Sequence, residues 1–143
     1  MPKSTTFAED IIALIFNGTN ISLIADNTAT TPLTVLYLSL HNGNPGIGGN
    51  QTTNETAYTN YTRVSVARNS GGWTCSGGVA TLAVLTQFPQ CGASGDTLTY
   101  VAIGTASSGS GLVLYAGALN ASLTVANLIQ PQFASSSLTT TES

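Results

Sequence analysis

The sequence predicts a mainly β fold: an antiparallel β-sandwich, jelly-roll-like, with one N-terminal α-helix. Runs rich in β-branched and aromatic residues recur from about residue 33 to residue 140, and clusters of Gly, Ser, Asn and Pro separate them. No helical pattern alternates with these runs, so βα units are not expected. The length of 143 residues, without a repeat of fixed period, indicates a single domain over residues 1–143.

The helix is expected at about residues 5–17. Thr6 can cap its N-terminus, with Glu9 as the partner in a capping box, and Asn17-Gly18 supplies the stop. Four apolar side chains fall on one helical face: Phe7, Ile11, Leu14 and Ile15. We expect this amphipathic helix to dock on the rest of the domain. The next stretch, residues 20–27, is expected to be a short turn or strand.

Seven strands are expected after the helix. Each corresponds to a short β-forming run that ends at a turn-rich cluster. The runs are residues 33–41, 58–69, 78–88, 96–106, 111–119, 121–128 and 130–140. Their near-regular spacing is typical of a sandwich.

The charge content is very low. Charged residues make up 6% of the chain, against about 25% in a typical soluble protein. The net charge is −3, so no basic face is available for nucleic acid or for an anionic membrane surface. The apolar run at residues 11–16 is too short to be a signal or a membrane span, which favours synthesis and assembly in the cytoplasm.

No catalytic, cofactor or metal motif is present. His41 is the only histidine and has no recognisable nucleophile or second histidine near it in the sequence, so we expect a hydrogen-bonded residue at a strand end. The loop that follows it, residues 42–59, contains Asn44-Pro45-Gly46, which is typical of a type II turn and not of a phosphate loop. Cys75 and Cys91 can form a disulfide only under oxidising conditions, and two buried thiols are the favoured alternative.

Glu55 is expected to pair with Arg63 or Arg68. In a chain with so few charges, we favour an intra-loop or inter-subunit clamp over an ordinary surface pair. The aromatic residues leave a second interpretation open, because exposed rings on a β surface can stack on sugars. The candidates for such a platform are Tyr58, Tyr61 and Trp73, and the alternative for Trp73 is a place in the core.

Several segments taken together resemble a known family. They are "LYLSLHNGNPG", "TNETAYTNYTRVSVAR", "GGWT", "FPQC" and "YVAIGTASSGSGLVLYAGAL". These segments are similar to those of small bacteriophage virion proteins that are labelled tail fibre proteins, and the likeness extends from Phe7 to about Pro131. In the family, the segment that begins at this histidine usually reads His-Thr-Ala-Asp-Pro-Gly. Here Asn44 replaces the Asp, which argues against a metal or catalytic site at this turn.

The resemblance implies a non-enzymatic virion structural protein that assembles in the host cytoplasm. Our leading expectation is a capsid decoration or cement protein, whose partners are the major capsid protein and itself, as a homodimer or homotrimer. The alternative is a tail fibre or tail-associated module that binds a receptor or a host glycan. No nucleic acid, membrane, cofactor or metal is expected. The candidate interface residues are Phe7, Ile11, His41, Asn44, Pro45, Glu55, Tyr58, Tyr61, Arg63 and Arg68.

Overall fold

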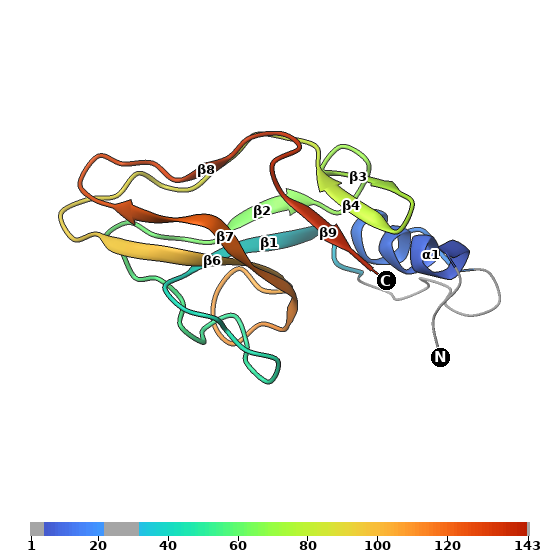
Figure 1. Ribbon diagram of the computed structural model, residues 1–143, viewed down its shortest axis with the longest axis horizontal. Helices are drawn as coiled ribbons and strands as arrows, with labels where there is room; N and C mark the ends of the chain where they lie inside the picture. Colours follow the sequence, from blue (N-terminus) through green and yellow to red (C-terminus); the bar gives the residue numbers. More distant parts are fainter. Residues whose placement is uncertain (1–4, 22–31, 143) are drawn as a thin grey trace. The chain divides into compact units, whose positions relative to one another are not determined.

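The computed structural model describes residues 5–21 and 32–142. These residues form one helix and nine strands (Figure 1). In chain order the elements are α1 (Thr5–Asn17), β1 (Val35–His41), β2 (Val64–Ala67), β3 (Trp73–Ser76), β4 (Val79–Leu82), β5 (Thr86–Gln87), β6 (Asp96–Gly104), β7 (Val113–Val125), β8 (Gln132–Phe133) and β9 (Thr139–Thr141). The fold class is confirmed: the protein is mainly β, with antiparallel sheets and one N-terminal helix.

The chain divides into two compact units. The described part of the first comprises residues 5–21, 32–35, 67–85 and 133–142, and the second comprises Leu36–Val66 and Thr86–Gln132. This division does not test the expectation of a single domain over residues 1–143, which stays a prediction.

The second unit is built on a four-stranded sheet in the order β2-β1-β6-β7. β1 pairs with β6 in antiparallel register, with Leu38 opposite Ile103 and Leu40 opposite Val101. All four side chains are at most 5% exposed. Burial of each such side chain stabilises the fold by about 1.5–3 kcal/mol. The apolar character of residues 33–41 is therefore explained by their position in the core.

β7 is longer than the sequence predicted. Residues 111–119 and 121–128 were expected to form two strands, but residues 113–125 form one strand along the edge of the sheet. Leu98 pairs with Leu123 and Tyr100 pairs with Ala118, so β7 carries three extra residues between these positions. A bulge on an edge strand absorbs them without a turn.

The first unit packs α1 against β3 and β4. Its buried helical face is Ala8, Ile12 and Phe16, each at most 7% exposed, and the Phe16 ring meets Trp73 edge-on at a centroid distance of 4.7 Å. The predicted face was wrong: Phe7 is 40% exposed. The other three members, Ile11, Leu14 and Ile15, are half-buried. The helix has two adjacent apolar stripes, and the buried Trp73 ring lies against the one that carries Phe16.

The N-terminal end of α1 differs from the prediction, and its C-terminal end agrees with it. α1 begins at Thr5, so Thr6 lies within the helix and is not its N-cap. The Glu9 carboxylate accepts a hydrogen bond from the Gly78 N–H at 2.5 Å, where the predicted capping box would have paired it with the N-cap residue. At the other end, Gly18 adopts a φ of +67° as expected. Arg68 then donates to the terminal carbonyls of Leu14 and Ile15, at 2.5 and 2.6 Å.

The remaining strand predictions hold in part. β3 was not expected, because its sequence follows the "SGG" turn signal directly. β2 covers only residues 64–67 of the expected run 58–69, while 78–88 and 130–140 each contain two shorter strands. Most of the expected turn or strand at residues 20–27 lies outside the described residues. In the ranges 5–21 and 32–142, no helix is long and apolar enough to cross a membrane.

Candidate functional site

The loop that joins β1 to β2 is held by a buried ion pair. Glu55 and Arg63 lie eight positions apart and meet in a two-pronged contact: Nε donates to Oε1 and Nη2 donates to Oε2, both at 2.7 Å. Their side chains are 15% and 2% exposed. The hydrogen bonds that Arg63 donates to Glu55 raise the pKa of Arg63 above its usual value. The predicted clamp therefore exists, within the loop and with Arg63 as its cation.

Arg63 also fastens a second segment. Its Nη1 donates to the carbonyl of Ala106 at 3.0 Å, and Nη2 donates to that of Gly109 at 2.8 Å. Four of the five N–H donors of a guanidinium are thus engaged inside the chain. The adjoining hollow of about 200 Å³ is lined by Ser107 and Ser108. Because Arg63 is nearly saturated, it acts as a structural tie rather than a ligand-binding cation.

Tyr61 completes this cluster. Its hydroxyl donates to Glu55 Oε1 at 2.9 Å and accepts from the Leu40 N–H at 3.0 Å. Burial raises the pKa of Tyr61 far above its usual value of 10.0. Tyr58 lies edge-on to Tyr61 at 5.3 Å and donates to the carbonyl of Pro89 at 2.9 Å, and burial raises its pKa to about 12.

These positions correct the sugar-platform interpretation. Tyr58 is 2% exposed and Trp73 is fully buried, so neither ring offers a face to a glycan. Tyr61 is half-buried and its hydroxyl is already bonded. The rings pack in the interior because burial of their apolar area stabilises the fold, and the tyrosine hydroxyls form hydrogen bonds within the chain.

His41 lies in the interior at the end of β1, as a hydrogen-bonded residue, which confirms the prediction. It is fully buried; Nδ1 donates to the carbonyl of Thr53 at 3.0 Å, and Nε2 of the neutral ring accepts from the Ser39 hydroxyl at 2.9 Å. Burial lowers the pKa of His41 below 6.5, and this effect exceeds the opposing hydrogen bond to Thr53. Both ring nitrogens therefore form hydrogen bonds within the chain.

Gln51 is a buried polar residue that the sequence did not reveal. Its side chain is fully buried, and Oε1 accepts from the Ala106 N–H at 2.9 Å. The amide fits between two glycines: a Cβ at Gly104 would come within 2.2 Å of it, and one at Gly111 within 2.1 Å. Nothing in a polar, aperiodic loop distinguishes this glutamine from its exposed neighbours, so only the tertiary contacts identify it.

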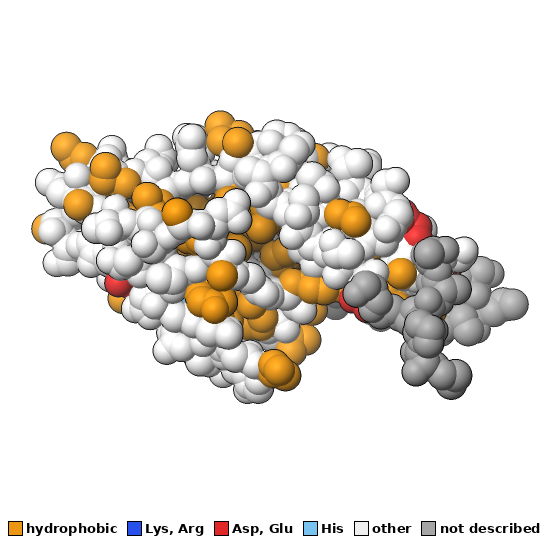
Figure 2. All heavy atoms as spheres, in the orientation of Figure 1, with side chains coloured by type: hydrophobic (Ala, Val, Ile, Leu, Met, Phe, Trp, Pro, Cys, Tyr) orange, Lys and Arg blue, Asp and Glu red, His pale blue; other side chains and the backbone are white. Residues whose placement is uncertain are grey.

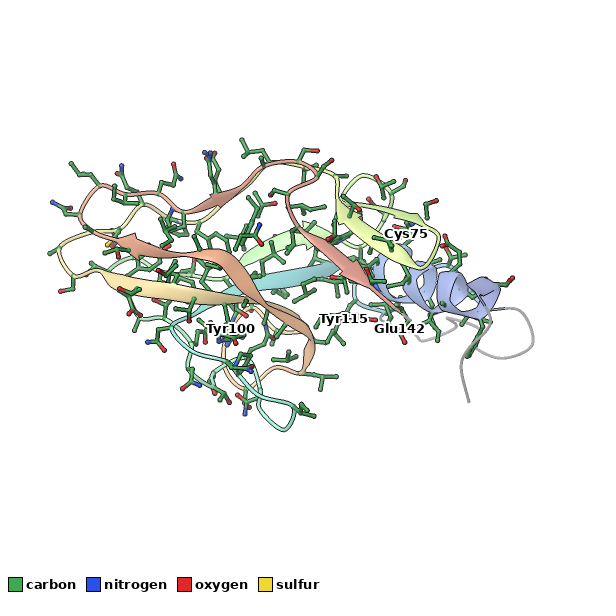
Figure 3. The ribbon with its side chains drawn as sticks, viewed as in Figure 1. Cys75, Tyr100, Tyr115 and Glu142 are labelled. Carbon is green, nitrogen blue, oxygen red and sulfur yellow. The ribbon has the colours of Figure 1, made fainter. Side chains whose placement is uncertain are left out.

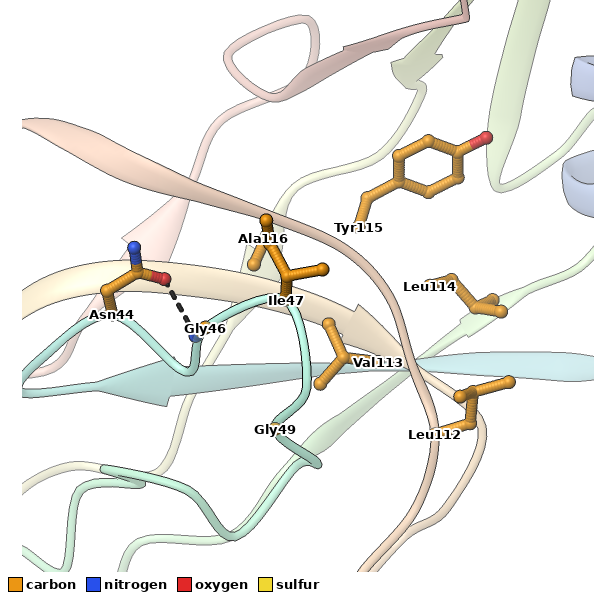
Figure 4. Close-up of a pocket in the computed structure, with 9 residues that line it drawn as sticks. All are labelled: Asn44, Gly46, Ile47, Gly49, Leu112, Val113, Leu114, Tyr115 and Ala116. Carbon is orange, nitrogen blue, oxygen red and sulfur yellow. Dashed lines mark hydrogen bonds between the residues drawn. The ribbon is translucent and has the colours of Figure 1, made fainter.

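The tip of the loop, residues 44–49, is largely exposed, although Pro45 within it is buried and Gly49 is half-buried. Gly46 has a φ of +77°, as the predicted turn requires, and its N–H donates to Asn44 Oδ1 at 2.9 Å. Ile47 projects fully into solvent, with a relative exposure of 111%. The tip faces residues 112–116 across a hollow of about 400 Å³ (Figure 4).

A comparison of the sequence with models of protein families shows which family the chain belongs to. The model described as "Podophage GP4 fiber I protein gp80" matches residues 2–141. The chain belongs to this family. A search of the curated proteins finds no match. As a member of the gp80 fibre family, the protein is a bacteriophage virion component with a structural role.

The candidate interface residues of this gp80-family protein fall into three groups by exposure. Phe7 and Asn44 are exposed, whereas Ile11, Glu55, Tyr61 and Arg68 are half-buried. Four members are buried: His41, Pro45, Tyr58 and Arg63. Polar residues in a turn-rich loop suggested exposure, but the hydrogen-bond partners of His41, Tyr58 and Arg63 lie inside the chain. Ile47 and Leu112, which the sequence did not single out, are 111% and 62% exposed.

The two cysteines are free thiols in this gp80-family structure. Cys91 is buried and donates weakly to the carbonyls of Gly92 and Ser94, both at 3.4 Å. Cys75 lies half-buried on β3 (Figure 3), and burial raises its pKa. Among the described residues, no cluster of His, Cys, Asp or Glu has the composition of a metal site.

Proposed function

We propose that this protein is a non-enzymatic structural subunit of a phage fibre. In this proposal it joins the virion through contacts with copies of itself and with a neighbouring virion protein. The observation that carries the proposal is the construction of the loop at residues 42–59. A buried polar network holds the base of the loop, while Ile47 at its tip is fully exposed to solvent. A rigid exposed loop lowers the entropy cost of forming a contact.

The use of the titratable groups supports a non-enzymatic role. Glu55 accepts from Tyr61 and Arg63, and both nitrogens of His41 are bonded. Asp96 Oδ2 accepts from the Thr56 hydroxyl at 2.7 Å and from the Asn42 amide at 3.2 Å. General acid or base chemistry needs a group within reach of a substrate proton. These side chains are instead engaged by other groups of the chain.

A second candidate is capsid decoration, with the major capsid protein as the partner. The observation that favours it is the absence of a repeat in the 143 residues, since fibre shafts are commonly repetitive. Exposed apolar side chains at the loop tip suit a contact of either kind, because contact area and shape complementarity are what such a surface provides.

The copy number per virion distinguishes these two functions. We would measure the molar ratio of this protein to the major capsid protein in purified particles by quantitative mass spectrometry. A small number of copies, with antibody labelling at the tail in electron micrographs, is expected for a fibre subunit. A ratio near one, or a simple lattice fraction with labelling over the whole shell, would replace it by capsid decoration. Absence from purified particles would contradict both.

A further inference from the structure

Asparagine followed by glycine occurs at two positions in the chain, Asn17-Gly18 and Asn42-Gly43. In this dipeptide the glycine nitrogen can attack the asparagine side chain, because glycine has no Cβ to obstruct the approach and leaves the backbone free to turn. The reaction needs an accessible side-chain amide, a backbone nitrogen that no acceptor holds, and a segment that can bend. The two positions differ in all of these respects.

Asn42 meets the requirements. It follows the last residue of β1, it is exposed, and residues 42 and 43 form a bend outside the strand. The Asn42 N–H donates to the Asn54 carbonyl at 2.9 Å, which fixes the backbone up to residue 42. Among residues 5–21 and 32–142, no acceptor is bonded to the next N–H, that of Gly43. The attacking nitrogen is therefore available.

Asn17 does not meet them. It is the last residue of α1, and its Oδ1 atom is buried. The Thr19 N–H closes the end of the helix by donating to the Ala13 carbonyl at 3.1 Å, and Arg68 donates to two carbonyls of the last turn. Attack by the Gly18 nitrogen would require this helix end to open and the asparagine side chain to leave the interior. The fold therefore protects this position.

We propose that Asn42-Gly43 is a site of self-modification, where asparagine converts to aspartate and isoaspartate while Asn17-Gly18 stays intact. The Gly43 nitrogen loses its proton to water and attacks Cγ of Asn42, and the new C–N bond closes a succinimide ring. The Cγ–Nδ2 bond breaks as Nδ2 takes up a proton and leaves as ammonia. Water then opens the ring: addition at Cγ gives aspartate, and addition at the main-chain carbonyl gives isoaspartate. No atom is oxidised or reduced.

The product changes the contacts at the base of the loop. The Asn42 amide donates to Asp96 Oδ2 at 3.2 Å, and the same oxygen accepts from the Thr56 hydroxyl at 2.7 Å. A bond of 3.2 Å on an exposed amide is long, so the side chain is free to turn toward Gly43. After the conversion a carboxylate replaces the amide donor beside Asp96, and an attraction becomes a repulsion.

This change is large for a protein with so few charges. Charged residues make up 6% of the chain, and on the face shown in Figure 2 only a few acidic side chains are visible. Isoaspartate also adds a methylene carbon to the main chain next to His41, which forms a bridge with Glu55. A virion component is not replaced after the particle is released, so the products accumulate with the age of the particle.

The first test compares the two positions within one wild-type protein. The full chain is incubated in mildly alkaline buffer, digested, and analysed by mass spectrometry for aspartate and isoaspartate at each position. We expect the products at Asn42 to form at least about tenfold faster than those at Asn17. In urea, where both segments are unfolded, the two rates should become similar. Comparable rates in the folded protein, or no product at Asn42, would overturn the proposal.

Two variants test the chemistry at residue 42. Asn42→Gln keeps the amide on a longer side chain that closes a ring less readily, and Gly43→Ala adds a methyl group beside the attacking nitrogen. The added Cβ would lie 3.3 Å from the Asn54 side chain, which a small shift relieves. Each variant should lower the rate at residue 42 at least about tenfold and leave the rate at Asn17 unchanged. An unchanged rate in Gly43→Ala would exclude the Gly43 nitrogen as the nucleophile.

Asn42→Asp tests the consequence, because it introduces the aspartate product directly. It should unfold at a lower urea concentration than the wild type, by a difference that shrinks as salt screens the two carboxylates. Asn120→Asp adds the same charge at an exposed asparagine of β7 that is not bonded to Asp96, and should change the midpoint less. Circular dichroism confirms that both variants are folded. Equal midpoints for the two variants would contradict the predicted repulsion at Asp96.

Discussion

Individual residues decide how the loop at residues 42–59 is held. Among residues 5–21 and 32–142, Glu55 is the carboxylate that lies against Arg63, and it accepts three hydrogen bonds from Arg63 and Tyr61. A buried ion pair is costly to form, but loss of one member is costlier, because the other is left as an unpaired buried charge. The stability of the loop therefore depends on the pair as a unit.

Glu55→Gln should destabilise the protein by about 3 kcal/mol, since Arg63 would keep its charge and lose its counterion. Urea unfolding followed by tryptophan fluorescence measures this change. The matched control is the double variant Glu55→Gln/Arg63→Met, which removes the charge as well and should recover part of the loss. A change below about 0.5 kcal/mol for Glu55→Gln would mean that the pair behaves as a surface salt bridge.

His41 should make stability depend on pH. Burial lowers its pKa in the folded protein below the unfolded value of 6.5, so its contribution is complete above pH 6.5. As the pH falls below that value, the unfolded chain takes up the proton first and the free energy of unfolding decreases. Urea unfolding between about pH 8 and about pH 5 should show this decrease in the wild type, and less of it in His41→Gln. Parallel profiles for the two proteins would exclude His41 as the cause.

At the scale of elements, Gln51 joins the loop to the end of β6 and the start of β7. The backbone of Gln51 bonds to Gly111, and its side chain bonds to Ala106. The two glycines at positions 104 and 111 leave room for the amide. Arg63 adds bonds to the carbonyls of Ala106 and Gly109, and Asp96 of β6 accepts from Asn42 and Thr56 of the loop.

Gly104→Ala should cost about 1–3 kcal/mol, because its methyl group would overlap the Gln51 amide. The three atoms nearest to a Cβ at this position all belong to the Gln51 side chain. In a Gln51→Ala background the added methyl group should therefore be tolerated. A double-mutant cycle by thermal or urea unfolding gives the coupling energy, which we expect to be about 1 kcal/mol or more. Additive effects would show that the methyl group meets another obstacle.

For the whole molecule, the sparse charge defines which partners are expected. Two of the three basic residues, Arg63 and Arg68, donate hydrogen bonds within the chain. With a net charge of −3, the protein offers little attraction to phosphate groups. We therefore expect contacts with other proteins to depend on apolar area and on uncharged hydrogen-bonding groups.

The protein should not bind nucleic acid or anionic vesicles. Non-specific DNA-binding proteins reach dissociation constants of about 10⁻⁴–10⁻⁶ M through several basic contacts, and this chain cannot supply them. Fluorescence anisotropy with a labelled duplex at low salt, and co-sedimentation with phosphatidylserine vesicles, should show no saturable binding. Salt-sensitive binding in either assay would reveal a basic surface that the described residues lack.

The sequence by itself determined the features that depend on local chemistry. The helix, its glycine stop and the first strand were predictable because capping residues, periodicity and β-branched runs act over a few positions. A hydrogen-bonded histidine at a strand end and an ion pair of Glu55 with Arg63 or Arg68 were also predictable, since few titratable groups were available; the structure decided for Arg63 and for the burial of His41. The resemblance of the quoted segments led to a phage virion family, and the match over residues 2–141 confirmed it at that level.

Only the tertiary structure decided which surfaces are buried. The helix could have buried either of two stripes, and the position of Trp73 decided for Ile12 and Phe16. Gln51 and Tyr58 look exposed in the sequence, yet their partners, Ala106 and Pro89, are distant in the chain. The position of β7 at the edge of its sheet likewise depends on the order of the strands. Burial and pairing arise from contacts between remote segments, and local patterns do not contain that information.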